Sequence, residues 1–173
     1  MILTGPPGAG KTATARLLAS GAEPAVHLES DRFFQFIRAA YVEPWEPEAH
    51  EQNKVVMRIV GGAAAGYADA GYFTIVDGIV APRWFYEPLR DDLRRAGHDV
   101  AYAILRPPLE VCRARAGSRD VRQVADEAVF ERLWREFDGL GPLESHAIDN
   151  GDMSAAETAE LLAQRIRSGE LTR

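Results

Sequence analysis

With 173 residues and a hydrophobic content of 46%, the chain has the size and composition of one globular domain and leaves no room for a second. A charged fraction of 27% and a net charge of −6 exclude a disordered tail and a basic nucleic-acid binder. The longest stretches without a charge have ten residues, about half of a membrane span, and no basic segment precedes an apolar one at the N-terminus. The only cysteine, Cys112, excludes an internal disulfide and a cysteine-built metal site. We expect a single cytoplasmic domain over residues 1–173 that binds neither nucleic acid nor membrane.

The first motif in chain order is a glycine-rich loop. The apolar residues 1–4 predict a strand, and residues 13–20, which are rich in helix formers and precede Gly21, predict a helix. Between them the sequence fits G-x-x-x-x-G-K-[ST] at every fixed position. Such a loop turns backbone N–H groups toward phosphate oxygens at the start of a helix. We therefore predict ATP binding by Gly5, Pro6, Pro7, Gly8, Ala9, Gly10, Lys11, Thr12 and Ala13.

Two side chains of this loop carry specific chemistry. Lys11 is one of only two lysines in the chain, the other being Lys54, and its compact ammonium group suits the β- and γ-phosphates. The hydroxyl of Thr12 is the residue type that binds Mg²⁺ in such loops. Lys11 is therefore a predicted catalytic residue, and Thr12 a predicted metal ligand.

Downstream of the loop, strand patterns alternate with helix patterns. The predicted strands cover residues 25–28, 72–76, 99–105 and 145–148, and the predicted helices cover residues 33–41, 48–70, 88–97, 109–116, 124–137 and 154–168. Ser154 and Glu157 have the spacing of a capping box at the start of the last helix. This alternation predicts an α/β fold of three layers, with a five-stranded parallel sheet covered by helices on both faces.

Carboxylates follow two of the predicted strands. Asp31 comes shortly after the strand at 25–28, and Asp77 comes directly after the strand at 72–76. In a parallel sheet, ligands bind outside the carboxyl ends of the strands. Asp31 is a candidate for accepting the proton of an attacking hydroxyl, or else a helix N-cap. Asp77 is a candidate for orienting Mg²⁺, or else part of an Asp-Gly turn.

Arginines gather after the helix predicted at residues 109–116. Arg113, Arg115, Arg119 and Arg122 lie within ten residues, and helical spacing places Arg115 and Arg119 on one face. Guanidinium groups can clamp a transferring phosphoryl group, so Arg115 and Arg119 are predicted catalytic residues on a lid around residues 115–124. The alternative is a solvated helix surface in an arginine-rich chain.

Together these features resemble the small P-loop kinases of the nucleoside-monophosphate-kinase type. The resemblance is to the branch of AAA-domain ATP-binding proteins with chloramphenicol phosphotransferase, the zeta toxins and gluconate kinase. It rests on the loop at 5–12, the segment opening with Asp31, the strand that ends in Asp77-Gly78, the helix at 109–115 and the residues 148–150. It implies an aspartate acting as base or substrate ligand and an arginine-bearing lid, carried here by Asp31 and residues 115–122. It also implies that adenine stacks on a lid arginine and meets the loop after the last strand, which points to Arg115 and Asn150.

The sequence thus favours a kinase that uses Mg²⁺ and ATP to phosphorylate a hydroxyl of a small molecule. Aromatic residues at 33–45 and 84–86 favour an acceptor with an apolar or ring-bearing face. Two alternatives stay open: a zeta-toxin-like kinase of a nucleotide sugar, and an ATP-binding regulatory module without small-molecule kinase activity.

Overall fold

The strands form one parallel sheet. The computed structural model describes residues 1–117 and 126–172. Its strands lie in the order β2-β3-β1-β4-β5. They are β1 (Ile2–Thr4), β2 (Ala25–Glu29), β3 (Phe73–Asp77), β4 (Tyr102–Leu105) and β5 (Ala147–Ile148), and all their pairings are parallel. Since β1 lies between β3 and β4 with helices on both faces, all of its residues are buried.

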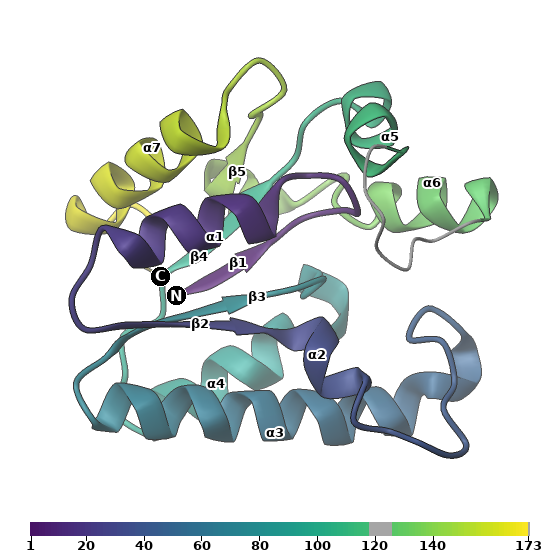
Figure 1. The fold of residues 1–173 in the computed structure, drawn as a ribbon, viewed down its shortest axis with the longest axis horizontal. Helices are drawn as coiled ribbons and strands as arrows, with labels where there is room; N and C mark the ends of the chain where they lie inside the picture. The colour runs from purple at the N-terminus through teal and green to yellow at the C-terminus, as the bar shows by residue number, and fades with distance from the viewer. Residues whose placement is uncertain (118–125, 173) are drawn as a thin grey trace.

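Helices cover both faces of the sheet (Figure 1). α1 (Lys11–Ser20) packs beside α7 (Ala155–Arg167) on one face, and α3 (His50–Asp69) packs beside α4 (Glu87–Arg95) on the other. Two apolar clusters fill the two sides, one around Val60 and Leu89 and the other around Leu18 and Leu162. The predicted α/β fold with three layers and a five-stranded parallel sheet is therefore confirmed. Within the described residues, none of the helices combines the length and apolar character that crossing a membrane requires.

Shorter elements lie near the carboxyl ends of the strands, on the right of Figure 1. They are α2 (Ser30–Phe34), the short π-helix η2 (Pro82–Tyr86), α5 (Leu109–Gly117) and α6 (Glu127–Arg135). Two 3₁₀ turns, η1 (Pro47–Ala49) and η3 (Gly141–His146), lead into α3 and β5. The site predicted from the sequence therefore lies at the carboxyl ends of the strands, where most of the short elements are found.

The structure corrects several predicted boundaries. The helix predicted at 33–41 is only α2, Ser30–Phe34. Ile37 and Tyr41 lie after its end and pack against the apolar cluster between α3 and the sheet, so tertiary packing outweighs local helix propensity here. The last strand shortens to Ala147–Ile148 because the 3₁₀ turn η3 takes up the residues before it. The helix predicted at 124–137 is α6, Glu127–Arg135, and Asp126 caps it by accepting from Ala128 and Val129 N–H.

The predicted capping box is present at the start of α7. The Ser154 hydroxyl accepts from the Glu157 N–H at 3.2 Å, and the Glu157 carboxylate accepts from the Ser154 N–H at 2.8 Å. These two bonds satisfy donors that a helix start otherwise leaves open, which explains why the sequence pattern located this helix start.

The glycine-rich loop packs directly against the first turns of α5. Gly8 has a φ of +77°, and a Cβ atom there would lie 2.1 Å from the Cys112 carbonyl oxygen and 2.8 Å from its carbon. Because these are backbone atoms inside a helix, no side-chain rotation can relieve the contact. Gly8 is therefore required both for the turn and for the close approach of α5.

We expect Gly8→Ala to lower the free energy of unfolding by about 2–4 kcal/mol, since it adds a steric clash to a left-handed backbone. Gly62→Ala is the matched control, because Gly62 lies within α3 and a Cβ there meets nothing within 4 Å. That variant should gain up to about 1 kcal/mol from helix propensity. Urea unfolding of both variants measures the difference, and equal stability of the two would contradict the packing described.

Candidate active site

The glycine-rich loop folds around its own lysine. The Lys11 ammonium donates to the carbonyl oxygens of Gly5 at 2.9 Å and Pro6 at 3.0 Å. Gly10 precedes α1 with a left-handed backbone, and the first N–H groups of the helix, like those of any α-helix, point out of its N-terminus, here toward the loop. The loop therefore presents backbone donors, a helix start and a cation at one place, which together can hold the phosphates of a nucleotide. Thr12 and Ala13 lie in the first turn of α1.

Asp31 lies in the first turn of α2 and is coupled electrostatically to Lys11. Solvent reaches the residue, but protein atoms crowd its carboxyl group. This crowding raises the pKa of Asp31; Lys11 opposes the change, and the carboxylates of Asp77 and Glu29 reinforce it. A raised pKa makes the carboxylate a better proton acceptor. Asp31 is not the N-cap of α2, which is Glu29.

Asp77 is the last residue of β3, and only 3% of its side chain is exposed. Its Oδ2 lies 3.2 Å from Nε2 of His27, whose side chain is 10% exposed. His27 pairs with Ile75 across β2 and β3, so it shares a face of the sheet with Asp77, two residues further along β3. This contact holds the Asp77 carboxylate at the strand end.

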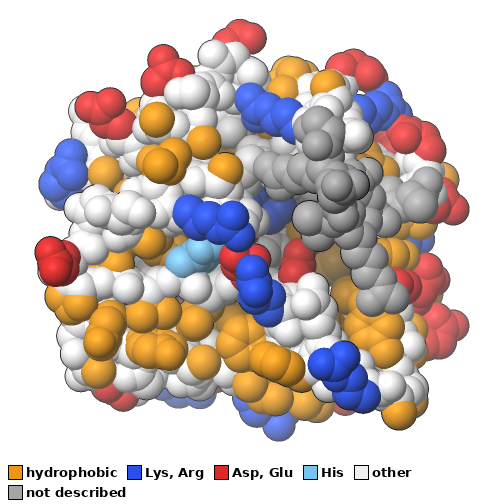
Figure 2. Space-filling view, in the orientation of Figure 1, with side chains coloured by type: hydrophobic (Ala, Val, Ile, Leu, Met, Phe, Trp, Pro, Cys, Tyr) orange, Lys and Arg blue, Asp and Glu red, His pale blue; other side chains and the backbone are white. Residues whose placement is uncertain are grey.

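His27 is a site residue that sequence reasoning missed. A histidine between apolar neighbours in a short strand gives no sign of its partner, and only the register of β2 against β3 brings it to Asp77. For Glu29 the sequence favoured a solvated loop position, whereas the structure places it at the end of β2, where it pairs with Arg16 of α1 at 2.9 Å and with Arg32 of α2 at 3.0 Å. Figure 2 shows a histidine side by side with acidic and basic side chains in the middle of this face.

Arg115 and Asn150 meet beside the loop. The Arg115 guanidinium donates to the carbonyl oxygens of Asn150 and Gly151, both at 3.0 Å, and to that of Met153 at 3.3 Å. The Asn150 amide donates to the Ala9 carbonyl at 3.0 Å, and its buried Oδ1 has no hydrogen-bond partner in the described part of the chain. The hydrogen bonds of Arg115 therefore join α5 to the loop after β5, and the hydrogen bond of Asn150 joins that loop to the glycine-rich loop.

The structure therefore brings most of the predicted site together. The loop from Gly5 to Ala13 lies beside Asn150 and Arg115, and Lys11, Asp31 and Asp77 form one group of interacting charges. Arg119 and most of the lid predicted at 115–124 lie outside the described residues. The roles given to these residues stay predictions.

The parallel sheet and the loop between β1 and α1 define the class of P-loop nucleotide-binding proteins with a kinase-like fold. The chain belongs to the AAA domain family, whose pattern matches residues 1–140. A search of curated protein sequences finds no match.

Solved structures with the same fold include several kinases. A sugar kinase from Janibacter sp. has a TM-score of 0.70 and 21% sequence identity, covering 96% of this chain and 92% of that one. The tunicamycin resistance protein of Deinococcus radiodurans has a TM-score of 0.70 and 22% identity, covering 95% of this chain and 94% of that one. Shikimate kinase from Acinetobacter baumannii, solved with shikimate, has a TM-score of 0.62 and 24% identity over 98% and 93%. These likenesses establish the kinase-like fold.

We expect Asp31→Asn to raise the free energy of unfolding at neutral pH. The folded protein binds the Asp31 proton more tightly than the unfolded chain does, because the pKa of Asp31 is raised in the folded state. As the pH rises from the unfolded-state pKa of about 4 through the raised folded-state pKa, Asp31 therefore lowers the free energy of unfolding. The increase in the free energy of unfolding caused by Asp31→Asn should therefore disappear at a pH below the ordinary aspartate pKa. Urea unfolding between pH 3 and pH 8 measures it, with Asp99→Asn, an exposed position before β4, as the control. A pH-independent difference would contradict the raised pKa.

Proposed function

We propose that the protein transfers the γ-phosphoryl group of ATP, bound with Mg²⁺, to a hydroxyl group of a small molecule. The observation that carries this proposal is the electrostatic interaction between Lys11, which lies in the glycine-rich loop, and the Asp31 carboxyl group with its raised pKa. A phosphate-binding cation and a proton acceptor are the two groups that such a transfer requires of the protein. The family match and the kinases among similar folds support it.

The residues present fit ATP and Mg²⁺. The loop from Gly5 to Ala13 would hold the phosphates, and Asn150, whose buried Oδ1 has no partner in the described chain, would face the base together with Arg115. A methyl group on Gly10 would lie 3.7 Å from Asn150 Nδ2 and 4.0 Å from Arg115 Nη1, so both side chains border the loop. Thr12 and Asp77 offer the hard oxygen donors that Mg²⁺ prefers. When bound, Mg²⁺ supplies positive charge to the β- and γ-phosphates.

The chain's own residues would then perform three tasks. Asp31 would orient the acceptor hydroxyl and take its proton, while the hydroxyl oxygen bonds to the γ-phosphorus and the bond from that phosphorus to the β–γ bridging oxygen breaks, leaving ADP. Lys11 would offset the negative charge of the phosphates. His27 would hold Asp77 in place through the 3.2 Å contact. We keep Arg115 and Arg119 as the arginines of a lid around residues 115–124, within a single domain of residues 1–173.

Two other functions remain as alternatives: a kinase acting on a nucleotide sugar, and an ATP-binding regulatory module. A regulatory module does not need a proton acceptor near the phosphates, so the electrostatic interaction of Asp31 with Lys11 favours an enzyme. A nucleotide sugar carries hydroxyl groups and is a special case of the proposed acceptor class.

We expect Lys11→Ala to weaken Mg·ATP binding at least tenfold, because a charge-assisted contact to phosphate contributes about 1.5–3 kcal/mol. Lys54→Ala is the matched control, since it removes the only other lysine, an exposed residue of α3 paired with Glu51. Isothermal calorimetry with magnesium measures both affinities. Equal binding by the two variants would refute the proposed role of the loop.

We expect Asp31→Asn to bind Mg·ATP nearly as well as the wild type but to transfer phosphate at least about a hundredfold more slowly, the usual contribution of a general base. The assay follows radioactive γ-phosphate from ATP onto sugars, sugar acids, nucleotide sugars and antibiotics, with Asp99→Asn as the control. If the wild type transfers phosphate and Asp31→Asn does so equally fast, Asp31 is not the base. If ATP binds but no acceptor in the panel is labelled, the result favours the regulatory module over the enzyme.

A further inference from the structure

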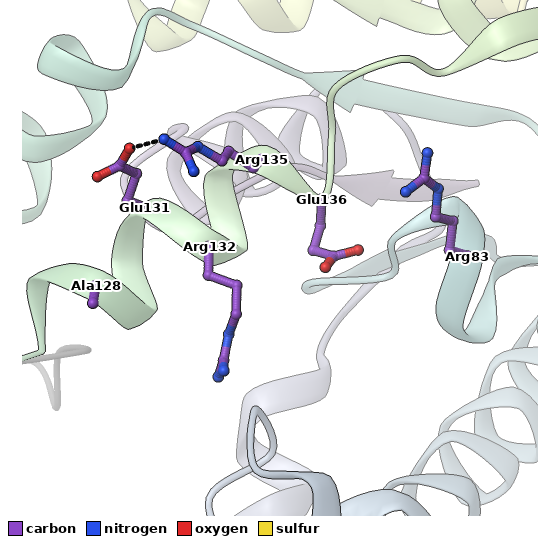
Figure 3. A pocket seen from close by; sticks show the side chains of 6 residues that line it. All are labelled: Arg83, Ala128, Glu131, Arg132, Arg135 and Glu136. Atoms are coloured by element: carbon purple, nitrogen blue, oxygen red, sulfur yellow. Dashed lines mark hydrogen bonds and ion pairs between the residues drawn. The ribbon is translucent and has the colours of Figure 1, made fainter.

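A charged pocket of about 410 Å³ lies between η2 and α6. Figure 3 shows Arg83 of η2 on one side and the side chains of α6 on the other. The lining carries three cations and two carboxylates: Arg83, Arg132, Arg135, Glu131 and Glu136, together with Ala128. A cationic excess in a protein of net charge −6 is a local feature that needs an explanation.

Of the three arginines that line this pocket, Arg83 is the one that has no partner in the described part of the chain. Within the described residues its guanidinium makes no hydrogen bond or ion pair, and the residue is exposed. Its backbone is nevertheless fixed, because Trp84 and Phe85 pack against the core and Tyr86 is buried against the ring of Tyr102, with ring centroids 3.8 Å apart. Arg83 thus projects from a rigid turn while its five N–H donors remain available.

The other cations of the pocket are held in place to different degrees. Arg135 forms an ion pair with Glu131, one turn earlier on α6, which cancels its charge. Arg132 donates to the carbonyl oxygen of Trp45 at 2.9 Å, a neutral acceptor that positions the guanidinium but leaves its charge in excess. The Glu136 carboxylate has no hydrogen bond or ion pair within residues 1–117 and 126–172. The pocket therefore offers guanidinium donors together with one open carboxylate acceptor.

The pocket is connected to the site through the chain segment after β3. Asp77 ends β3 and Arg83 follows six residues later. Between them, Val80 N–H donates to the buried Thr4 hydroxyl at 2.8 Å, and Tyr102 OH donates to the Val80 carbonyl at 2.7 Å. These bonds fix the segment to β1 and β4. Arg83 therefore has a fixed position relative to the strand end that carries Asp77.

We propose that this pocket binds an anionic group of the acceptor, a phosphate or carboxylate on a hydroxyl-bearing small molecule, and that Arg83 is its main ligand. Forked guanidinium donors match the oxygens of both anions, while a carboxylate such as Glu136 accepts hydrogen bonds from hydroxyl groups of the same molecule. The proposal rests on the proposed function, because it assigns the substrate class of that same site.

The test uses the full chain saturated with Mg·ADP, so that the glycine-rich loop is occupied. Inorganic phosphate, glucose 6-phosphate, gluconate and glucose are titrated at constant ionic strength. The readout is tryptophan emission, because the chain's three tryptophans, Trp45, Trp84 and Trp134, lie on the segments around the pocket. The two charged sugars distinguish a phosphate from a carboxylate as the preferred anion.

We expect a saturable response to at least one anionic probe, with glucose at least about tenfold weaker, and a loss of about tenfold in anion affinity in Arg83→Gln. Arg83→Lys keeps the positive charge but loses the paired N–H donors of the guanidinium group, so its anion affinity should lie between those of the wild type and Arg83→Gln. Arg95→Gln is the matched control, since Arg95 is an exposed α4 residue paired with Asp92. Circular dichroism checks that each variant is folded.

A response that is absent, or equally strong in Arg83→Gln, overturns the anionic subsite. The phosphate-transfer assay separates this failure from failure of the proposed function. Anion binding that depends on Arg83, without transfer to any alcohol, supports the subsite and counts against the kinase. Transfer to neutral alcohols that is unaffected by Arg83→Gln supports the kinase and refutes the subsite.

Discussion

The constraint on which the site depends is the close contact between the glycine-rich loop and α5. The loop leaves the central, fully buried β1 and must turn back into α1 with the Cys112 carbonyl only 2.1 Å from where a Cβ of Gly8 would lie. Burial of the Cys112 thiol raises its pKa to about 11, so the side chain at this contact serves packing rather than chemistry. Because β1 has β3 on one side and β4 on the other, the loop is fixed where Asp77 and the start of α5 also lie.

The ends of β2 and β3 bring several carboxylates close together. Asp31, Asp77 and Glu29 all end or follow β2 and β3, which are neighbours in register, with Glu29 opposite Asp77. The molecule neutralises Glu29 with Arg16 and Arg32 and places His27 against Asp77. For Asp31, the attraction of Lys11 opposes the desolvation of the carboxyl group and the repulsion from Asp77 and Glu29, and the pKa of Asp31 is raised as a result. A carboxyl group whose pKa is raised by desolvation and by neighbouring carboxylates is a candidate for a functional site.

Local patterns were sufficient for the fold and for part of the site. The glycine-rich loop, the buried strand before Asp77 and the capping box of Ser154 and Glu157 depend on residues close in sequence, so the sequence located them. The His27–Asp77 contact depends on which strand neighbours β2, and the short α2 depends on where Ile37 and Tyr41 pack. Neither the contact nor the length of α2 can be predicted from residues that are neighbours in sequence. Arg83 could not be singled out among many arginines, because only the fold shows that no residue of the described ranges pairs with it.

The segment from Asp77 to Tyr86 joins the two ends of the site. Its first residue, Asp77, lies at the strand end and interacts electrostatically with Asp31, and its middle is fixed to Thr4 and Tyr102 by two hydrogen bonds. Its last part presents Arg83 to the pocket facing α6. Since both ends are anchored in the same buried core, the distance between the phosphate loop and the pocket is set by the sheet itself. An acceptor that is held by its anionic group at Arg83 would therefore be selected by length as well as by charge.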